Sequence, residues 1–150
     1  MILVVIESPY AGAVDENVKY AQQCVLDSLR RGEAPVASHL LYTQEGILDD
    51  LEPNERELGL RAGWTWTDRA DLVAVYVDRG ISPGMYRGIG YALEGFVNVE
   101  LRSLRTKTTI PVSSFSSIDA LLENMLSELP DQQTEASLPF SELPASTDQS

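Results

Sequence analysis

Apolar residues along this chain gather in short continuous runs, and longer segments with helical periodicity separate these runs. A continuous run such as ILVVI at 2–6 is typical of a strand that is covered on both faces of a sheet. The predicted strands are 2–6, 36–42, 72–77 and 97–101, and 110–112 forms either a short fifth strand or an irregular connection. The predicted helices are 16–31, 54–69 and 84–95, followed by one that begins after Ser117 and faces inward with Ile118, Leu121, Leu122, Met125 and Leu129.

Capping residues mark where these helices begin. Asp15 is placed to cap the first helix, and Asn54 with Glu57 resembles a capping box for the second. Ser82 precedes Pro83, and proline is favoured at the first position of a helix. Ser117 is expected to cap the last helix.

The alternation of strands and helices predicts an α/β fold. We expect a three-layer sandwich around a mostly parallel sheet of four or five strands, similar to the Rossmann and flavodoxin folds. Ligands bind such sheets beyond the carboxyl ends of the strands. The site should therefore be built from 7–12, 42–46, 78–84 and 101–104.

Composition narrows the class of protein. The formal charge of −12 argues against binding to nucleic acid polymers or to an anionic membrane. A single cysteine, Cys24, permits no internal disulfide, which fits a cytoplasmic protein, and the apolar N-terminus is interpreted as a strand and not as a signal peptide. With one histidine and one cysteine, no metal site and no cofactor is expected.

The C-terminal segment differs in composition. Residues 127–150 contain five acidic residues and no lysine or arginine, and they repeat the tetrapeptide SELP. We therefore divide the chain into an α/β domain at 1–129 and an acidic, Pro/Ser-rich, disordered tail at 130–150. The tail either keeps the protein in solution or carries a partner-binding peptide around 138–143.

The stretch DRGISPGMYRGIGYA at 78–92 contains a candidate anion site. If a helix begins at Pro83, the N–H groups of Gly84 and Met85 point out of its N-terminus, where the helix dipole favours negative charge. Ser82 adds a hydroxyl donor. The alternative is an ordinary strand-to-helix turn in which Ser82 is only a cap.

The same stretch carries a family resemblance. SPGMYRGIGYA resembles the signature S-x-G-x-x-x-E-x-G-x-A of the nucleoside 2-deoxyribosyltransferase superfamily, which includes 2'-deoxynucleoside 5'-phosphate N-hydrolases. Ser82, Gly84, Gly90 and Ala92 match it. The whole chain is similar to small uncharacterised deoxyribosyltransferase-like proteins of actinobacterial phages through SPYAG, RGEAPVASHLLYTQEG, NERELG and DRGISPGM.

The resemblance implies a nucleotide pocket with altered chemistry. It gives Ser82 the role of contacting a 5'-phosphate, and it matches Ser8 and Tyr10 to a tyrosine-bearing loop after the first strand. It also implies a homodimer or higher homo-oligomer. The position of the superfamily's glutamate nucleophile is Gly88 here, and that of a second carboxylate is Gly63.

Other carboxylates could replace the missing ones. Glu7 ends the first strand and Asp78 ends the third, and both are expected at the site, with Tyr10 assisting catalysis. The alternatives are that Glu7 pairs with an arginine at the edge of the core and that Asp78 caps a turn.

Further residues are candidates for contacts to sugar or base. These are Ser8, His39, Tyr42, Arg56, Trp64 and Trp66. His39 is equally interpretable as a hydrogen-bonded core or surface residue, Arg56 as a solvated charge, and the tryptophans as core residues.

Two functions follow from these patterns. In the first, the protein binds a nucleoside 5'-phosphate or related nucleotide and cleaves or transfers at the N-glycosidic bond. In the second, it is a non-catalytic nucleotide-binding protein that sequesters or senses its ligand.

Overall fold

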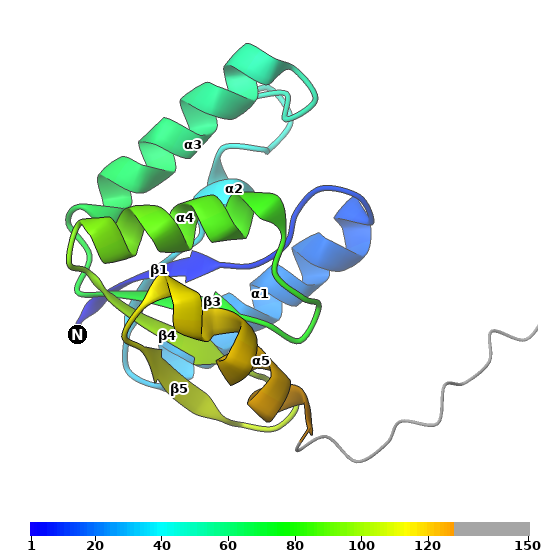
Figure 1. Ribbon diagram of the computed structural model, residues 1–150. Helices are drawn as coiled ribbons and strands as arrows, with labels where there is room; N and C mark the ends of the chain where they lie inside the picture. Colours follow the sequence, from blue (N-terminus) through cyan, green and yellow to red (C-terminus); the bar gives the residue numbers. More distant parts are fainter. Residues whose placement is uncertain (128–150) are drawn as a thin grey trace, which may run out of the picture.

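The computed structural model describes residues 1–127, which form a five-stranded sheet flanked by helices (Figure 1). The strands are β1 (Leu3–Glu7), β2 (Ala34–Val36), β3 (Leu72–Tyr76), β4 (Asn98–Arg102) and β5 (Thr109–Val112). Their order in the sheet is β2-β1-β3-β4-β5. The first four strands run parallel and β5 pairs antiparallel with β4. The predicted α/β sandwich with a mostly parallel sheet is confirmed.

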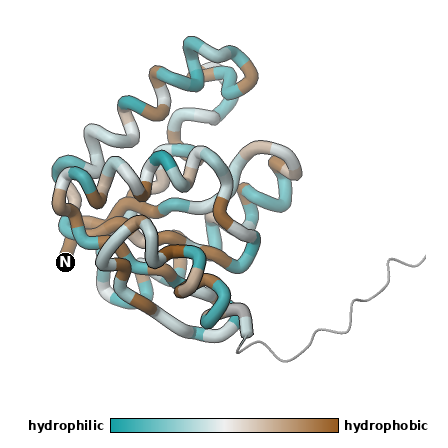
Figure 2. Tube along the Cα trace, viewed as in Figure 1, coloured by the Kyte–Doolittle hydropathy of each residue, from teal (hydrophilic) through white to brown (hydrophobic). Residues whose placement is uncertain are grey.

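Helices cover both faces of the sheet. They are α1 (Val14–Arg30), the single turn α2 (Ser38–Leu41), α3 (Pro53–Thr67), α4 (Pro83–Glu94) and α5 (Ile118–Ser127), the last preceded by the 3-10 turn η1 (Phe115–Ser117). Val5, Val73 and Val75 pack on the face covered by α4 and α5, whereas Val4, Ile6 and Ala74 pack on the face of α1. Figure 2 shows hydrophobic colouring concentrated along the central strands. Period-two alternation therefore decides which strand residues face which helices.

The strand order creates a place for a ligand. From β1 the chain crosses to β2 on one side, and later to β3 on the other side. The carboxyl ends of β1 and β3 consequently lie at the point where the order reverses, which is where such sheets bind ligands. The helix α3 packs against α2 and α4 beside this point (Figure 1).

The prediction of a strand at 36–42 is wrong. The strand ends at Val36, and α2 follows at Ser38–Leu41. β2 pairs with β1 over only three residues, which leaves the backbone after Val36 without a ladder partner. The chain instead forms a helical turn in which Leu41 N–H donates to the carbonyl of Ala37. The carboxyl end of β2 therefore precedes His39 rather than following it.

Three predicted caps also differ from the structure. Asp15 lies inside the first turn of α1, whose N-cap is Ala13. Proline at the start of α3 makes Glu52 the N-cap, so Asn54 forms no capping box. Ser117 belongs to η1, and its hydroxyl donates to the carbonyl of Ser114. By contrast, Ser82 caps α4 as predicted, because its Oγ accepts from the N–H of Met85 at 3.2 Å.

Some expectations lie outside the described residues. The tail at 130–150 and Leu129 are among them. The open question about 110–112 is resolved, because these residues belong to β5. In the part of the chain that the structure describes, no helix combines the length and the apolar surface needed to cross a membrane.

Candidate functional site

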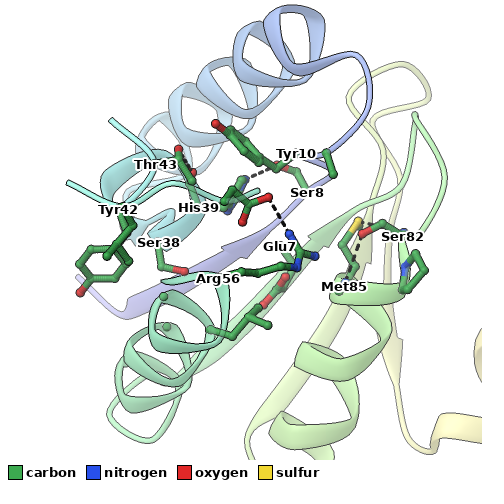
Figure 3. A pocket seen from close by; sticks show the side chains of 18 of the residues that line it. Glu7, Ser8, Tyr10, Ser38, His39, Tyr42, Thr43, Arg56, Ser82 and Met85 are labelled. Atoms are coloured by element: carbon green, nitrogen blue, oxygen red, sulfur yellow. Dashed lines mark hydrogen bonds and ion pairs between the residues drawn. The ribbon is translucent and has the colours of Figure 1, made fainter. Parts of the chain in front are cut away.

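A cavity of about 300 Å³ opens at the carboxyl ends of β1 and β3 (Figure 3). Its walls come from the end of β1 and the loop after it, from α2, from the connection between α2 and α3, from one side of α3 and from the start of α4. This volume is within the range of small-ligand sites. The structure brings most of the predicted site residues to this cavity, namely Glu7, Ser8, Tyr10, His39, Tyr42, Arg56, Trp64, Ser82, Gly84 and Met85.

Glu7 supplies a carboxyl group to the cavity from the end of β1. Its alternation with Val5 turns the side chain toward α4, where it meets the backbone of Gly88. A Cβ atom on Gly88 would lie 2.9 Å from the carboxyl carbon of Glu7, and nearer still to its Oε1. Any side chain at position 88 would therefore overlap the space that Glu7 fills.

The surroundings of Glu7 favour its neutral form. Within residues 1–127 its carboxyl has no hydrogen-bond or ion-pair partner, and burial raises its pKa to about 8. Since no enclosed polar side-chain atom lacks a partner in the described residues, the carboxyl oxygens are open to the cavity. The pairing of Glu7 with an arginine, which the sequence left open, is absent from this part of the chain. Glu7 is thus placed as a protonated acid at neutral pH.

A second glycine repeats the arrangement on α3. A Cβ atom on Gly63 would lie 2.6 Å from Oγ of Ser38, which is the first residue of α2. Ser38 lines the cavity. Polar groups from β1 and α2 thus occupy the spaces beside two glycines on α4 and α3.

Ser8 and His39 form a hydrogen-bonded pair in the same wall. Ser8 is only 5% exposed, and its Oγ lies 2.7 Å from Nε2 of His39. Burial lowers the pKa of His39 to about 4, so that the ring is neutral at neutral pH. Thr43 fixes the turn that carries the ring, because its hydroxyl donates to the main-chain carbonyl of His39.

Arg56 supplies a guanidinium group to the cavity beside the start of α4. Its Nη2 lies 3.4 Å from the position that a Cβ on Gly84 would occupy, which is an ordinary van der Waals distance. The N-terminal end of α4 also attracts anions. Asp50 holds Arg56 in place through a 2.6 Å ion pair. Ser82 and Gly84 therefore adjoin a cation as well as a helix N-terminus.

Aromatic side chains border the entrance. Tyr42 lines the cavity, and its hydroxyl accepts a 2.9 Å hydrogen bond from the indole of Trp66. Trp66 itself is 46% exposed and does not line the cavity; instead it positions Tyr42. Trp64 lines the cavity and stacks on Tyr91 with ring centroids 5.0 Å apart.

Asp78 lies outside the cavity, contrary to the sequence-based expectation. Its carboxylate accepts from the hydroxyl of Ser103 at 2.6 Å, from that of Tyr20 at 2.6 Å, and from the N–H groups of Leu104 and Arg105. Burial alone would raise the pKa of Asp78, but these hydrogen bonds, led by the one from Ser103, outweigh burial and lower it. The carboxylate is fully used in holding the strand ends together, which corresponds to the alternative of a turn-capping role.

Sequence patterns indicate two contributors only weakly. Ser38 lies within the predicted strand at 36–42, and Asp50 belongs to no motif. A serine opening a short helical turn after a three-residue strand is a weak signal, and the pairing of Asp50 with Arg56 depends on the path of the loop between α2 and α3. Within residues 1–127 no three His, Cys, Asp or Glu side chains are grouped so that they could hold a metal ion.

Comparison with solved structures identifies the class of fold. The chain superposes on a 2-deoxyribosyltransferase from Bacillus psychrosaccharolyticus with a TM-score of 0.50 and 16% identity, over 67% of this chain and 72% of that one. The molecule thus has the deoxyribosyltransferase fold. Lower TM-scores are found for the CMP N-glycosidase BcmB of Clostridium botulinum (0.44, 16% identity, 67% and 71% covered) and a 2-desoxiribosyltransferase from Leishmania mexicana (0.48, 13%, 69% and 65%).

The family is defined by sequence. Residues 2–102 match the family described as "Domain of unknown function (DUF7768)", and the chain belongs to that family. The matched segment runs from β1 to the end of β4 and so includes every element that lines the cavity. No curated protein matches the chain.

Proposed function

We propose that this protein binds a nucleoside 5'-phosphate, or a related nucleotide, in the cavity between β1 and α4 and breaks its N-glycosidic bond. The observation that carries the proposal is the carboxyl group of Glu7, which is open to the cavity and lies beside the backbone of Gly88. The Bacillus psychrosaccharolyticus protein of the same fold is a 2-deoxyribosyltransferase, which supports a nucleoside as the class of ligand.

The charges of the cavity support an orientation for the ligand. The phosphate lies against the hydroxyl of Ser82, the N–H group of Gly84 and Arg56, whereas the N–H of Met85 already donates to Oγ of Ser82. The sugar then extends toward Glu7, Ser8 and Tyr10, and the nucleobase toward Tyr42, whose aromatic face accepts any nucleobase.

Glu7 acts in this proposal as the acid. Its carboxyl group is protonated at neutral pH, because burial raises its pKa to about 8. It therefore gives a proton to the base while the bond between the base and C1′ breaks.

The proposal is tested by release of free base from a panel of nucleoside 5'-monophosphates and the corresponding nucleosides. We expect Glu7→Gln to lower kcat by at least about 100-fold with little change in KM, because general acid catalysis contributes 10²–10⁴-fold. Arg56→Gln should raise KM for the 5'-phosphates and leave KM for the nucleosides unchanged. Glu45→Gln, in an exposed residue of the same region, is the matched control. Wild-type rates in Glu7→Gln would contradict the proposal.

One observation favours a second function, a nucleotide-binding protein without catalysis. Glycosidic cleavage generally uses two carboxyl groups, and the two other carboxylates of the cavity are engaged, Asp50 with Arg56 and Glu55 with the N–H of Asp49. A rise in melting temperature with a nucleotide, but no release of base, would favour this function. The homodimer or higher homo-oligomer expected from the resemblance stays a prediction.

A further inference from the structure

The Ser8–His39 pair is a second proton-handling group in the cavity. The two side chains come from the loop after β1 and from α2, and they are joined by the 2.7 Å contact between Oγ and Nε2 (Figure 3). Both line the same cavity as Glu7. In the described residues no carboxylate contacts the imidazole, and Ser8 is its side-chain hydrogen-bond partner.

None of the described charged groups that share the cavity with His39 pairs with its ring, which is therefore a neutral imidazole. The groups that share its cavity are Glu7, Tyr10, Tyr42, Asp50, Glu55 and Arg56. Asp50 and Arg56 pair with each other, and Glu55 accepts from the N–H of Asp49. Burial lowers the pKa of His39 to about 4 and raises that of Glu7 to about 8. Between these values the cavity holds a neutral base and a neutral acid, which is how an acid and a base are assigned in one site.

We propose that Ser8 and His39 together form the general base that removes a proton from an attacking water molecule. The protein then hydrolyses its nucleotide instead of transferring the sugar to a second nucleobase. This inference rests on the proposed function, and it names the reaction and the group that activates the second substrate. Ser8 contacts the water and is a catalytic residue, whereas His39 acts through Ser8 and is a positioning and proton-accepting residue.

In the proposed hydrolysis, the water oxygen bonds to C1′ of the sugar. The proton of the water passes to Oγ of Ser8, and the hydroxyl proton of Ser8 passes to Nε2 of His39. The bond between C1′ and the base breaks with its electron pair moving to the base, which receives the proton of Glu7. The products are the free base and the sugar 5-phosphate. The proton on His39 then returns to Glu7 through solvent.

Rescue of activity by azide distinguishes a general base from a residue that is only structural. The azide anion attacks carbon without losing a proton, so it needs no general base. We expect His39→Gln and Ser8→Ala each to lower kcat in water by about 100-fold with KM unchanged. Azide should restore release of base in both variants, but not in Glu7→Gln, which lacks the acid. The double variant Ser8→Ala/His39→Gln should lose no more activity than either single one, because the two residues act as one unit. Glu45→Gln serves as the matched control.

The outcomes separate this proposal from the proposed function. If Glu7→Gln abolishes release of the nucleobase but His39→Gln releases it at the wild-type rate, only the assignment of Ser8 and His39 as the general base is overturned. Loss of activity that azide does not restore also overturns it. If the wild-type protein releases no base from any nucleotide, with or without azide, both proposals fall. Melting temperatures are measured first, and if His39→Gln does not fold, Ser8→Ala interrupts the same relay from the loop after β1.

Discussion

At the scale of the residue, the properties of Glu7 come from its neighbours. A glutamate at the end of a strand is ordinarily charged, yet burial without a partner keeps this one neutral up to a pKa of about 8. The same lack of partners that makes Glu7 a usable acid also makes it unfavourable for folding. Activity and stability are therefore in conflict at this position.

Because the buried Glu7 is unfavourable for folding, we expect its replacement by glutamine to stabilise the folded protein. The pKa of Glu7 is about 8 in the folded protein, whereas in the unfolded chain it is about 4.3. The free energy of unfolding should therefore fall as pH rises between these values, and Glu7→Gln should remove this fall. At neutral pH we expect Glu7→Gln to be more stable by about 2 kcal/mol. Urea unfolding as a function of pH checks this, and identical slopes in the two proteins would contradict it.

At the scale of the element, β1 and α4 share one space. Glu7 extends from the strand into the room that a side chain on the helix would need at Gly88. A carboxyl group could in principle enter the cavity from either element. A glutamate at position 88 would carry its carboxyl carbon about 2.5 Å from its own Cβ, two bonds away. The carboxyl carbon of Glu7 lies 2.9 Å from the same Cβ position, so the two carboxyl groups would reach similar distances from it.

The carboxyl group should therefore be transferable. We expect Glu7→Ala to lose release of base and the double variant Glu7→Ala/Gly88→Glu to recover at least about 10-fold of it. Gly88→Ala alone should lower stability by about 1–3 kcal/mol through overpacking, and Glu7→Ala should relieve this loss. Kinetics and thermal unfolding of the four variants measure both effects. Additive losses of stability would show that the two positions do not share space.

At the scale of the whole molecule, Asp78 joins three parts of the fold. It follows β3, receives the hydroxyl of Tyr20 from α1, and receives the N–H groups of Leu104 and Arg105 from the connection between β4 and β5. These bonds hold the carboxyl end of the sheet, on which the cavity is built. Asp78 thus supports the site without entering it.

Removing its charge should weaken the fold and leave the chemistry unchanged. We expect Asp78→Asn to lower the free energy of unfolding by about 1–3 kcal/mol at neutral pH, because an amide cannot accept all four hydrogen bonds. Since the folded pKa is lowered, this contribution is present above about pH 4 and is lost as pH falls further. Denaturant unfolding at neutral and acidic pH measures it. A variant with full stability but reduced kcat would contradict this role.

Much of the fold follows from local patterns. The continuous apolar runs predicted β1 and β3, and Ser82 with Pro83 predicted the start of α4. The error at 36–42 has a tertiary cause, because β2 ends where its pairing with β1 ends. Nothing in VASHLLY by itself distinguishes a strand from a short strand followed by a helical turn.

The sequence by itself determined the α/β class, the edge of the sheet that carries the cavity, and many of the residues that line it, because strand burial and helix capping are local effects. Only the tertiary structure decided how those residues are used. It placed Glu7 against Gly88 and Ser38 against Gly63, joined Ser8 to His39, and directed Asp78 away from the cavity. These decisions depend on contacts between elements far apart in the chain, and such contacts set the burial and the partners that fix the charge of each group.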